Sequence, residues 1–586
     1  MNTNRLLANR NLILFSLFLS IPVVACCAGE KVYLWPEGKM PDAQPQQIAA
    51  PTAETAKPDF KPDEWRRPYL EWEEAPKAEK KTDVCMIIIS GGAYECCCDG
   101  PAFRPLIKKM QDAGIQCVTF MYRTPRPKDL PIYQSGWEDG QRAVRLVRSE
   151  AEKRGFNPEK IGVMGCSAGS HLSLLLALNS QTPAYEPVDE LDKLPCHINW
   201  AVPFCPAYVL TDGLTGANKT GGEGPDVKIS PVFKFDEKTC PVCFFHGGKD
   251  PYSPIGSTQV YRQLRRMNVP AELHLDAGRG HGPVGAAAYE RALEFMRQIG
   301  VLGELKPPVK HMSRVSDRFT AKREIENLWP EGKMPSVQTN QTYAPTLEWF
   351  IPTELKTKAI QVIVPGGAYK FCSVNGEGTV VAQWFNEKGM AAVVVKYRCP
   401  RPKGLAKHVT AWQDAQRAIR MVRSEAPARG LDPDRIGIMG FSAGGHLTIM
   451  TATNAKTPAY EPIDDIDRVP CNVQWACPIY PAYVLTDGID GGNAKGGNDD
   501  SAVIVPEFSF DDQTPPMCFV HGDADGVAAM GSVKIWEKLR RMGIQSDLHT
   551  LAKRGHCFQM NASPETGSYT WQDRLWEFLS RKGLNR

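Results

Sequence analysis

The chain has 586 residues, enough for two to four domains of ordinary size with complete hydrophobic cores. Apolar residues make up 42% and charged residues 23%, which excludes a disordered or collagen-like chain. The 69 basic and 66 acidic residues leave a formal charge of +3, too small a surplus for a nucleic-acid-binding surface.

The N-terminus has the features of an export signal. Arg5 and Arg10 precede an apolar run over 12–24, which is shorter than the roughly 20 residues that a membrane-spanning helix needs. We expect residues 1–28 to be a signal peptide, so that the protein is periplasmic, extracellular or attached to the outer surface. Residues 23–26 also resemble the bacterial lipobox, so lipidation at Cys26 and simple cleavage both stay open. A lipid anchor there is the one membrane attachment we expect.

After the signal, apolar patterning alternates between strands and helices. The expected strands are Cys85–Ser90, Gln116–Tyr122, Ile161–Met164, Val242–His246 and Ala271–Leu275. Helices are expected over Glu138–Arg154 and on the face marked by Val260, Leu264 and Met267. Repeated β-α-β units indicate a mostly parallel sheet with helices on both faces.

The chain then repeats itself at a constant offset of 275 residues. The repeated segments are 90–94 and 365–369, 165–169 and 440–444, and 279–281 and 554–556. About three positions in five are identical between 161–213 and 436–488, far more than shared periodicity gives. The sequence therefore predicts two tandem copies of one α/β domain, over 30–303 and 326–586, joined by a linker over 304–325.

Each repeat carries a Gly-x-Ser-x-Gly motif between a buried strand and a helix, which is typical of a nucleophile elbow. An aspartate after a later strand and a histidine in a glycine loop follow at spacings of 83 and 31 residues in both repeats, in the chain order of α/β-hydrolases. We expect the histidine to deprotonate the serine and the aspartate to hold the histidine tautomer. The predicted catalytic residues are Ser167, Asp250 and His281 in the first repeat and Ser442, Asp525 and His556 in the second.

The glycine turn after the first long strand of each repeat is a candidate oxyanion hole. A tetrahedral acyl-transfer intermediate needs preorganised backbone N–H donors, and small residues let the backbone approach the reacting carbonyl. The expected donors are Gly92, Ala93 and Ala168, with Gly367, Ala368 and Ala443 as their equivalents. Which two of the three amides point inward stays open. This chemistry requires no metal ion and no cofactor.

The second repeat resembles serine esterases of the α/β-hydrolase superfamily grouped with bifunctional feruloyl and acetylxylan esterases. The segments that carry the resemblance are 365–369, 377–378, 396–398, 440–446 and 521–525. The resemblance covers nearly all of both repeats. It implies hydrolysis of acetyl or feruloyl esters on plant-type polysaccharides or oligosaccharides.

The first repeat departs from this pattern at three positions. Ala102, Ser90 and Ser170 stand where the second repeat has Glu377, Pro365 and Gly445, which puts the acyl specificity of the first site in question.

Two other functions remain open on the sequence. A serine peptidase of the prolyl-oligopeptidase type shares the fold and the triad order, although no propeller-sized repeat array precedes either unit. Alternatively, one repeat, most readily the first, is a non-catalytic carbohydrate-binding module that kept the fold.

Several other repeated side chains are expected to be structural. These are His171 and His446 after each serine, the matched tryptophans Trp137, Trp200, Trp412 and Trp475, and the loop aspartates Asp189, Asp192, Asp212, Asp464, Asp467 and Asp487. The run over 96–98 favours buried thiols or one disulfide over a metal cluster. Disulfide pairing among the cysteines that follow Cys27 cannot be assigned from spacing.

Overall fold

The computed structural model describes residues 29–43, 67–98, 103–211, 227–282, 285–303, 322–486, 502–560 and 571–584. The predicted signal peptide, Cys26, most of the predicted linker, and Ala102, Asp212 and Asp487 lie outside these residues. The described strands form one 16-stranded sheet to which each repeat contributes eight strands.

The first repeat supplies one half of this sheet, in the order β1-β2-β4-β3-β5-β6-β7-β8. The strands are β1 (Glu30–Tyr33), β2 (Tyr69–Trp72), β3 (Cys85–Ile89), β4 (Gln116–Met121), β5 (Ile161–Cys166), β6 (Trp200–Phe204), β7 (Val242–Gly247) and β8 (Ala271–Asp276). Strands β3 to β8 run parallel, and β1 and β2 add an antiparallel edge.

The second repeat has the matching order β9-β10-β12-β11-β13-β14-β15-β16, read inward from its edge. The strands are β9 (Lys322–Asn327), β10 (Thr346–Ile351), β11 (Ile360–Val364), β12 (Ala391–Lys396), β13 (Ile436–Phe441), β14 (Trp475–Ile479), β15 (Cys518–Gly522) and β16 (Asp547–Leu551). Strands β11 to β16 are parallel to one another, and β9 and β10 form an antiparallel edge.

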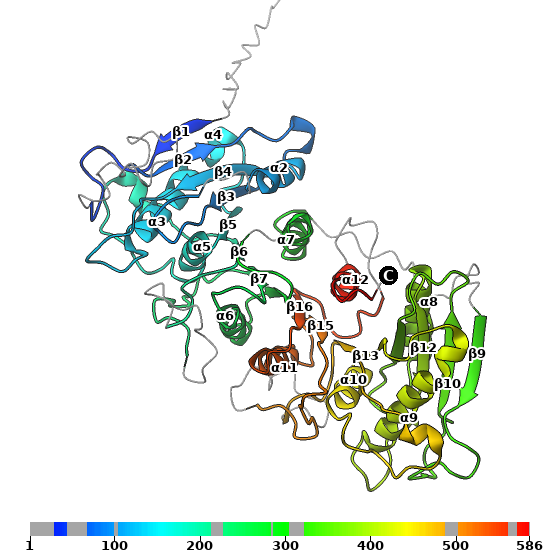
Figure 1. The fold of residues 1–586 in the computed structure, drawn as a ribbon. Helices are drawn as coiled ribbons and strands as arrows, with labels where there is room; N and C mark the ends of the chain where they lie inside the picture. Colours follow the sequence, from blue (N-terminus) through cyan, green and yellow to red (C-terminus); the bar gives the residue numbers. More distant parts are fainter. Residues whose placement is uncertain are drawn as a thin grey trace, which may run out of the picture.

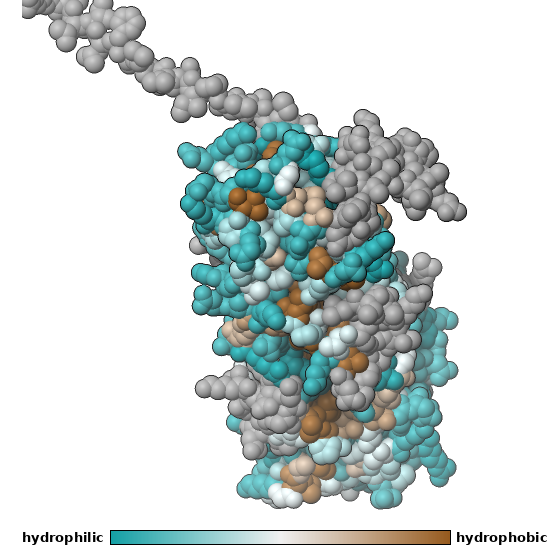
Figure 2. All heavy atoms as spheres, turned by 90° about the vertical axis from the view of Figure 1, so that its left-hand side faces the viewer, coloured by the Kyte–Doolittle hydropathy of each residue, from teal (hydrophilic) through white to brown (hydrophobic). Residues whose placement is uncertain are grey.

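Helices cover both faces of the sheet, as predicted (Figure 1). In the first repeat they are α2 (Arg104–Asp112), α3 (Gln134–Ser149), α4 (Ala151–Arg154), α5 (Ala168–Leu178), α6 (Ile255–Arg266) and α7 (Ala286–Gln298). In the second they are α8 (Val380–Glu387), α9 (Val409–Glu425), α10 (Ala443–Thr453), α11 (Met530–Arg541) and α12 (Trp571–Arg581). The face presented in Figure 2 is mostly hydrophilic, with small separate groups of hydrophobic residues.

The predicted strands correspond to β3, β4, β5, β7 and β8 with ends shifted by at most two residues. The helix predicted over Glu138–Arg154 is different, because it begins at Gln134 and is interrupted at Glu150 to give α3 and α4. Gly136 obscures the helical pattern, but a Cβ there would lie 3.1 Å from the ring of Tyr94, so the glycine permits close packing. None of the described helices is long and apolar enough to cross a membrane.

The two halves of the sheet meet edge to edge through β8 and β16. We call these two strands and the helices packed on them the seam. The strands are antiparallel, and His274 pairs with His549, its equivalent in the other repeat. An approximate two-fold axis therefore passes through this pair, as in an isologous dimer interface. Helices α6 and α11 lie together on one side of the seam, and α7 and α12 lie on the other (Figure 1).

The polar contacts across the seam are not symmetric. Asp523 of the second repeat lies 2.6 Å from Arg265 Nε and accepts hydrogen bonds from the Tyr261 hydroxyl at 3.1 Å and the Ala271 N–H at 3.3 Å. Burial raises the pKa of Asp523 to about 7, although Arg265 opposes this shift. The first repeat has Gly248 at this position, whose carbonyl accepts a hydrogen bond from Arg540. The two sides of the seam are therefore chemically distinct.

Candidate active sites

Each predicted nucleophile lies on a tight turn between a strand and a helix. Ser167 follows β5 and begins α5 with φ 57° and ψ −119°, and Ser442 has φ 53° and ψ −116° between β13 and α10. These positive φ values are strained for a side chain larger than glycine and are typical of a nucleophile elbow. A Cβ on Gly165 would lie 2.3 Å from the Gly169 carbonyl oxygen, and one on Gly169 would lie 2.4 Å from that of Ile89. Both motif glycines are therefore needed for close backbone contact.

The structure brings the predicted serine, histidine and aspartate together in both repeats. His281 Nε2 lies 2.9 Å from Ser167 Oγ, and His281 Nδ1 lies 2.8 Å from Asp250 Oδ2. In the second repeat, the corresponding distances from His556 to Ser442 and Asp525 are both 2.7 Å. Both imidazoles are thus placed to accept a serine proton while the carboxylate orients the ring.

The ionisation of the acids suits this arrangement. Burial opposes ionisation of Asp250, but hydrogen bonds from His246 and His281 outweigh it and lower the pKa of Asp250 to about 2. At Asp525, hydrogen bonds from His521 and His556 likewise outweigh burial and lower the pKa to about 2. Burial likewise disfavours the imidazolium form of His281, but the bond to the carboxylate outweighs it, so the pKa of His281 is raised. The imidazolium form of His281 is therefore stabilised at this position.

A second histidine contacts the aspartate of each triad. The sequence analysis assigned no role to this histidine. His246 Nε2 lies 3.0 Å from the Tyr252 carbonyl and 3.3 Å from Asp250 Oδ2, while its Nδ1 lies 2.9 Å from Ser257 Oγ. His521 occupies the same position in the second repeat. The sequence does contain a signal for this residue, because a histidine stands four positions before the aspartate in both repeats.

The predicted oxyanion turns lie against the nucleophiles. A Cβ on Gly91 would lie 3.1 Å from Ser167 Cβ, and one on Gly366 would lie 3.2 Å from Ser442 Cβ. Among the described residues, none accepts a hydrogen bond from the N–H groups of the six predicted donors, Gly92, Ala93, Ala168, Gly367, Ala368 and Ala443. These amides are therefore available to a bound carbonyl oxygen.

The two sites differ beside the triad. In the second repeat, Glu377 accepts hydrogen bonds from the Gly366 N–H and the Tyr480 hydroxyl, both at 2.8 Å. In the first repeat, Cys205 replaces Tyr480, and its Sγ lies 3.4 Å from Cys166 Sγ. In the second repeat, a carboxylate therefore holds the backbone of the predicted oxyanion turn. The first repeat has Ala102 at the matching position, and alanine has no carboxylate.

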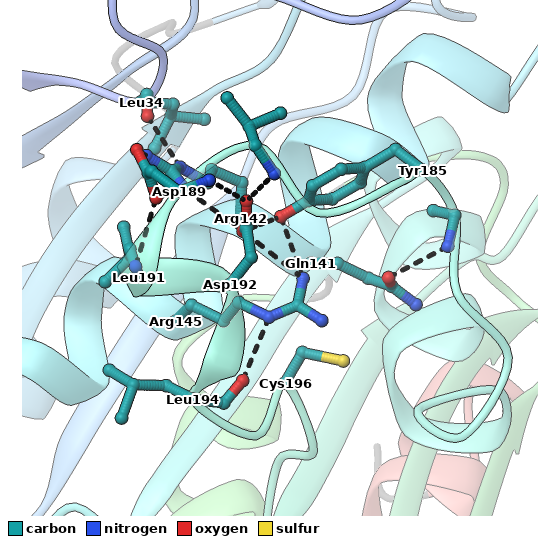
Figure 3. Close-up of polar contacts among 12 residues, drawn as sticks. Leu34, Gln141, Arg142, Arg145, Tyr185, Asp189, Leu191, Asp192, Leu194 and Cys196 are labelled. Carbon is teal, nitrogen blue, oxygen red and sulfur yellow. Dashed lines mark hydrogen bonds and ion pairs between the residues drawn. The ribbon is translucent and has the colours of Figure 1, made fainter.

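The four loop aspartates within the described residues form ion pairs with arginines. Asp189 makes a two-pronged contact with Arg142 of α3, at 2.6 and 2.7 Å, and Asp192 lies 3.0 Å from the same guanidinium (Figure 3). Asp464 and Asp467 bind Arg417 in the same way. These ion pairs connect a loop to a helix, which agrees with the structural role that we expected for these aspartates.

His171 and the matched tryptophans pack within the protein. His171 is fully buried, and its Nδ1 lies 2.8 Å from the Tyr94 hydroxyl. Trp200 and Trp475 are fully buried over the glycines of the neighbouring strands β5 and β13. Trp137 is buried and Trp412 half-buried.

The cysteines of the described residues are all free thiols. Cys97 is buried, and Cys96 and Cys98 are exposed with their sulfurs 3.5 Å apart. Two groups of cysteine, acid and histidine lie at the seam, but their acids, Glu272 and Asp547, are occupied by ion pairs with arginines.

Comparison with known proteins finds one family model and several proteins to which the chain is similar. The BD-FAE family model matches residues 74–205 and 347–477, one segment in each repeat. The chain is similar to an acetylxylan esterase of Xylanibacter ruminicola, 27% identical over 254 residues, which cover 41% of this chain and 46% of that protein. It is also similar to endo-1,4-beta-xylanase B of Butyrivibrio fibrisolvens, 27% identical over 207 residues, which cover 34% and 32% of the two chains.

Among solved structures, an acetyl ester-xyloside bifunctional hydrolase from Caldicellulosiruptor lactoaceticus aligns with a TM-score of 0.38 and 24% identity. The alignment covers 44% of this chain and 97% of that one. The chain spans less than half the length of the two curated relatives.

Proposed function

We propose that the protein is a serine carboxylesterase with two active sites, one in each of the repeats that the BD-FAE family model matches. The resemblance read from the sequence is confirmed by this family match, and similarity to esterases supports a carboxylic ester hydrolase. The observation that carries the proposal is the Ser–His–Asp arrangement in both repeats, with serine–histidine distances of 2.9 and 2.7 Å.

In the proposed reaction, His281 or His556 removes the serine proton as Oγ attacks the ester carbonyl. The amides of the glycine turn and of the residue after the serine bind the oxyanion. The protonated histidine then gives its proton to the departing sugar hydroxyl. A water activated by the same histidine hydrolyses the acyl-enzyme and releases the acid.

For the substrate, we propose acetyl esters on plant-type polysaccharides or oligosaccharides, with feruloyl esters as the second choice. The similarity to a protein named acetylxylan esterase supports this choice. Measurement of the acids released from a panel of acetylated and feruloylated glycans tests it. Release of neither acid, with cleavage of proline-containing peptides instead, would favour the peptidase alternative.

The catalytic assignment is tested with Ser167→Ala, Ser442→Ala and the double variant on a chromogenic acetate ester. Each single variant is expected to retain the activity of the other site, and the double variant to lose about 10⁴-fold or more. Ser149→Ala, which alters an exposed serine on α3, is the control. Unchanged hydrolysis in the double variant would refute the assignment.

Labelling separates a catalytic first repeat from a carbohydrate-binding module. In the Ser442→Ala background, a fluorophosphonate is expected to label Ser167. Polysaccharide binding without labelling would favour the binding module.

We further propose that the chain is exported through the segment 1–28. Cell fractionation tests this, and Cys26→Ser distinguishes the two forms of export, because only a lipoprotein would lose its membrane attachment.

A further inference from the structure

Three potential metal ligands converge behind the oxyanion turn of the second site. His408 directly precedes α9, His446 lies on α10, and Glu507 lies in the segment between β14 and β15. His446 Nε2 is 3.4 Å and His408 Nδ1 is 3.9 Å from Glu507 Oε1. The three ligand atoms lie within 4.8 Å of one another.

Both imidazole nitrogens that face this carboxylate lack a hydrogen-bond partner among the described residues. His446 is fully buried, so its Nε2 has no solvent to replace the missing partner. Buried polar atoms are nearly always paired, and a bound water or ion is one explanation for an unpaired one. Both nitrogens lie within 4 Å of the same carboxylate oxygen.

The residue types suit a cation. Two imidazole nitrogens and one carboxylate oxygen are ordinary ligands for a divalent transition metal.

The other side of His446 also fits a ligating imidazole. His446 Nδ1 lies 2.8 Å from the Tyr369 hydroxyl. A lone pair on Nε2 places the ring proton on Nδ1, where it is donated to the tyrosine oxygen. Metal-bound histidines generally donate their second N–H in this way.

The first repeat lacks two of the three ligands at the same positions. Its His171 keeps the bond to Tyr94, but Tyr133 and Val232 replace His408 and Glu507. His171 Nε2 is also unpaired, and the His171 ring packs against the rings of Tyr133 and Phe233. His408 and Glu507 therefore accompany the buried histidine only in the second repeat.

We propose that His408, His446 and Glu507 bind one divalent transition-metal cation of the zinc type. Bonds of about 2.0–2.1 Å in tetrahedral geometry separate ligand atoms by about 3.4 Å. The 3.4 Å separation of His446 and Glu507 already meets this value, and the separation of His408 and Glu507 exceeds it by about half an ångström. Water completes the coordination. Through His446 and Tyr369 the ion supports the turn that carries Gly367 and Ala368, and this inference does not depend on the proposed esterase activity.

The test uses the full chain after removal of metals by a chelator. Titration with Co²⁺ is followed by its visible absorption, and titration with Zn²⁺ by calorimetry. The wild type is expected to bind one equivalent with a tetrahedral-type cobalt spectrum. His408→Tyr combined with Glu507→Val restores the residues of the first repeat and is expected to weaken binding at least 100-fold.

Glu507→Gln, which is nearly isosteric, provides a second variant if the double substitution impairs folding, and it is expected to weaken binding as well. His197→Ala is the control, because it removes a histidine beside Glu159 in the first repeat and should leave binding unchanged. No stoichiometric binding by the wild type, or equal affinity in the ligand variants, would overturn the proposal.

Discussion

The seam makes a quantitative prediction about Asp523. Replacing Asp523 by alanine leaves Arg265, the Tyr261 hydroxyl and the Ala271 N–H without their acceptor at a buried position. Leaving a buried donor without its acceptor costs about 1–3 kcal/mol, and we take about 2 kcal/mol for Arg265 because its side chain is 17% exposed. An orphaned hydroxyl adds about 1 kcal/mol. An unfolding entropy of about 2.1 cal/mol/K per residue gives about 1.7 °C per kcal/mol for a repeat of about 280 residues, so the melting temperature should fall by roughly 5 °C.

Calorimetry or circular dichroism measures this change, with Asp465→Ala as the matched control. Asp465 pairs with Arg468 at the surface, where both side chains are more than 80% exposed, so its loss should cost less than about 1 kcal/mol. Asp523→Asn should be milder than Asp523→Ala because it keeps an acceptor oxygen. If Asp523→Ala lowered the melting temperature no more than the control does, the seam carboxyl would not stabilise the protein.

The same residue predicts a pH dependence of stability. Its folded pKa of about 7 exceeds the unfolded value of about 3.9, so the folded state binds the proton more tightly between these values. The contribution of Asp523 to the free energy of unfolding is therefore full below about pH 4 and is lost as the pH rises towards 7. Asp523→Asn, which cannot ionise, should lack this part of the slope in denaturation measured from pH 4 to 8. An unchanged slope would contradict the assignment.

Two further predictions concern the second site and are measured in the Ser167→Ala background. Asp525→Asn should lower kcat by about 10⁴-fold and move the acid limb of the kcat/KM profile to lower pH, because the carboxylate raises the pKa of His556 and the base acts in its neutral form. An unshifted limb would contradict this role. Glu377→Ala should lower kcat by up to about 10²-fold by releasing the Gly366 amide, whereas Glu377→Gln should recover most of the rate. Equal rates in the two Glu377 variants would exclude a bracing role.

The parts of the molecule that could be predicted are those encoded locally. The elbow around Ser167 requires glycines at fixed positions, and the strand–elbow–helix pattern lies within about twenty consecutive residues. The acid and base come from loops far along the chain, yet their repetition at equal spacing marked Asp250 and His281. Repetition also exposed the difference between Glu377 and Ala102.

The seam could not be predicted, because β8 reads like an ordinary terminal strand. Apolar residues alternate with Glu272 and His274, as expected where one face of a strand meets water. In the structure both faces are buried, because the second repeat covers the edge and Arg291 pairs with Glu272. Pairing between segments some 275 residues apart leaves no periodicity in either strand.

The grouping of His408, His446 and Glu507 was equally hidden. They come from three separate segments, and neither histidine stands in a metal-binding motif. The constant offset shows that Tyr133 and Val232 stand where the second repeat has His408 and Glu507, but only the structure shows that these two positions are neighbours.

The seam also fixes how the two halves associate. An isologous pair of separate subunits falls apart on dilution, whereas here both partners belong to one polypeptide, so their docking is intramolecular and does not depend on protein concentration. Each molecule necessarily holds one copy of either half, and neither half must complement itself. This freedom allows a carboxylate on one side of the junction to face an arginine on the other, and it lets two pockets with different walls persist in a fixed one-to-one ratio.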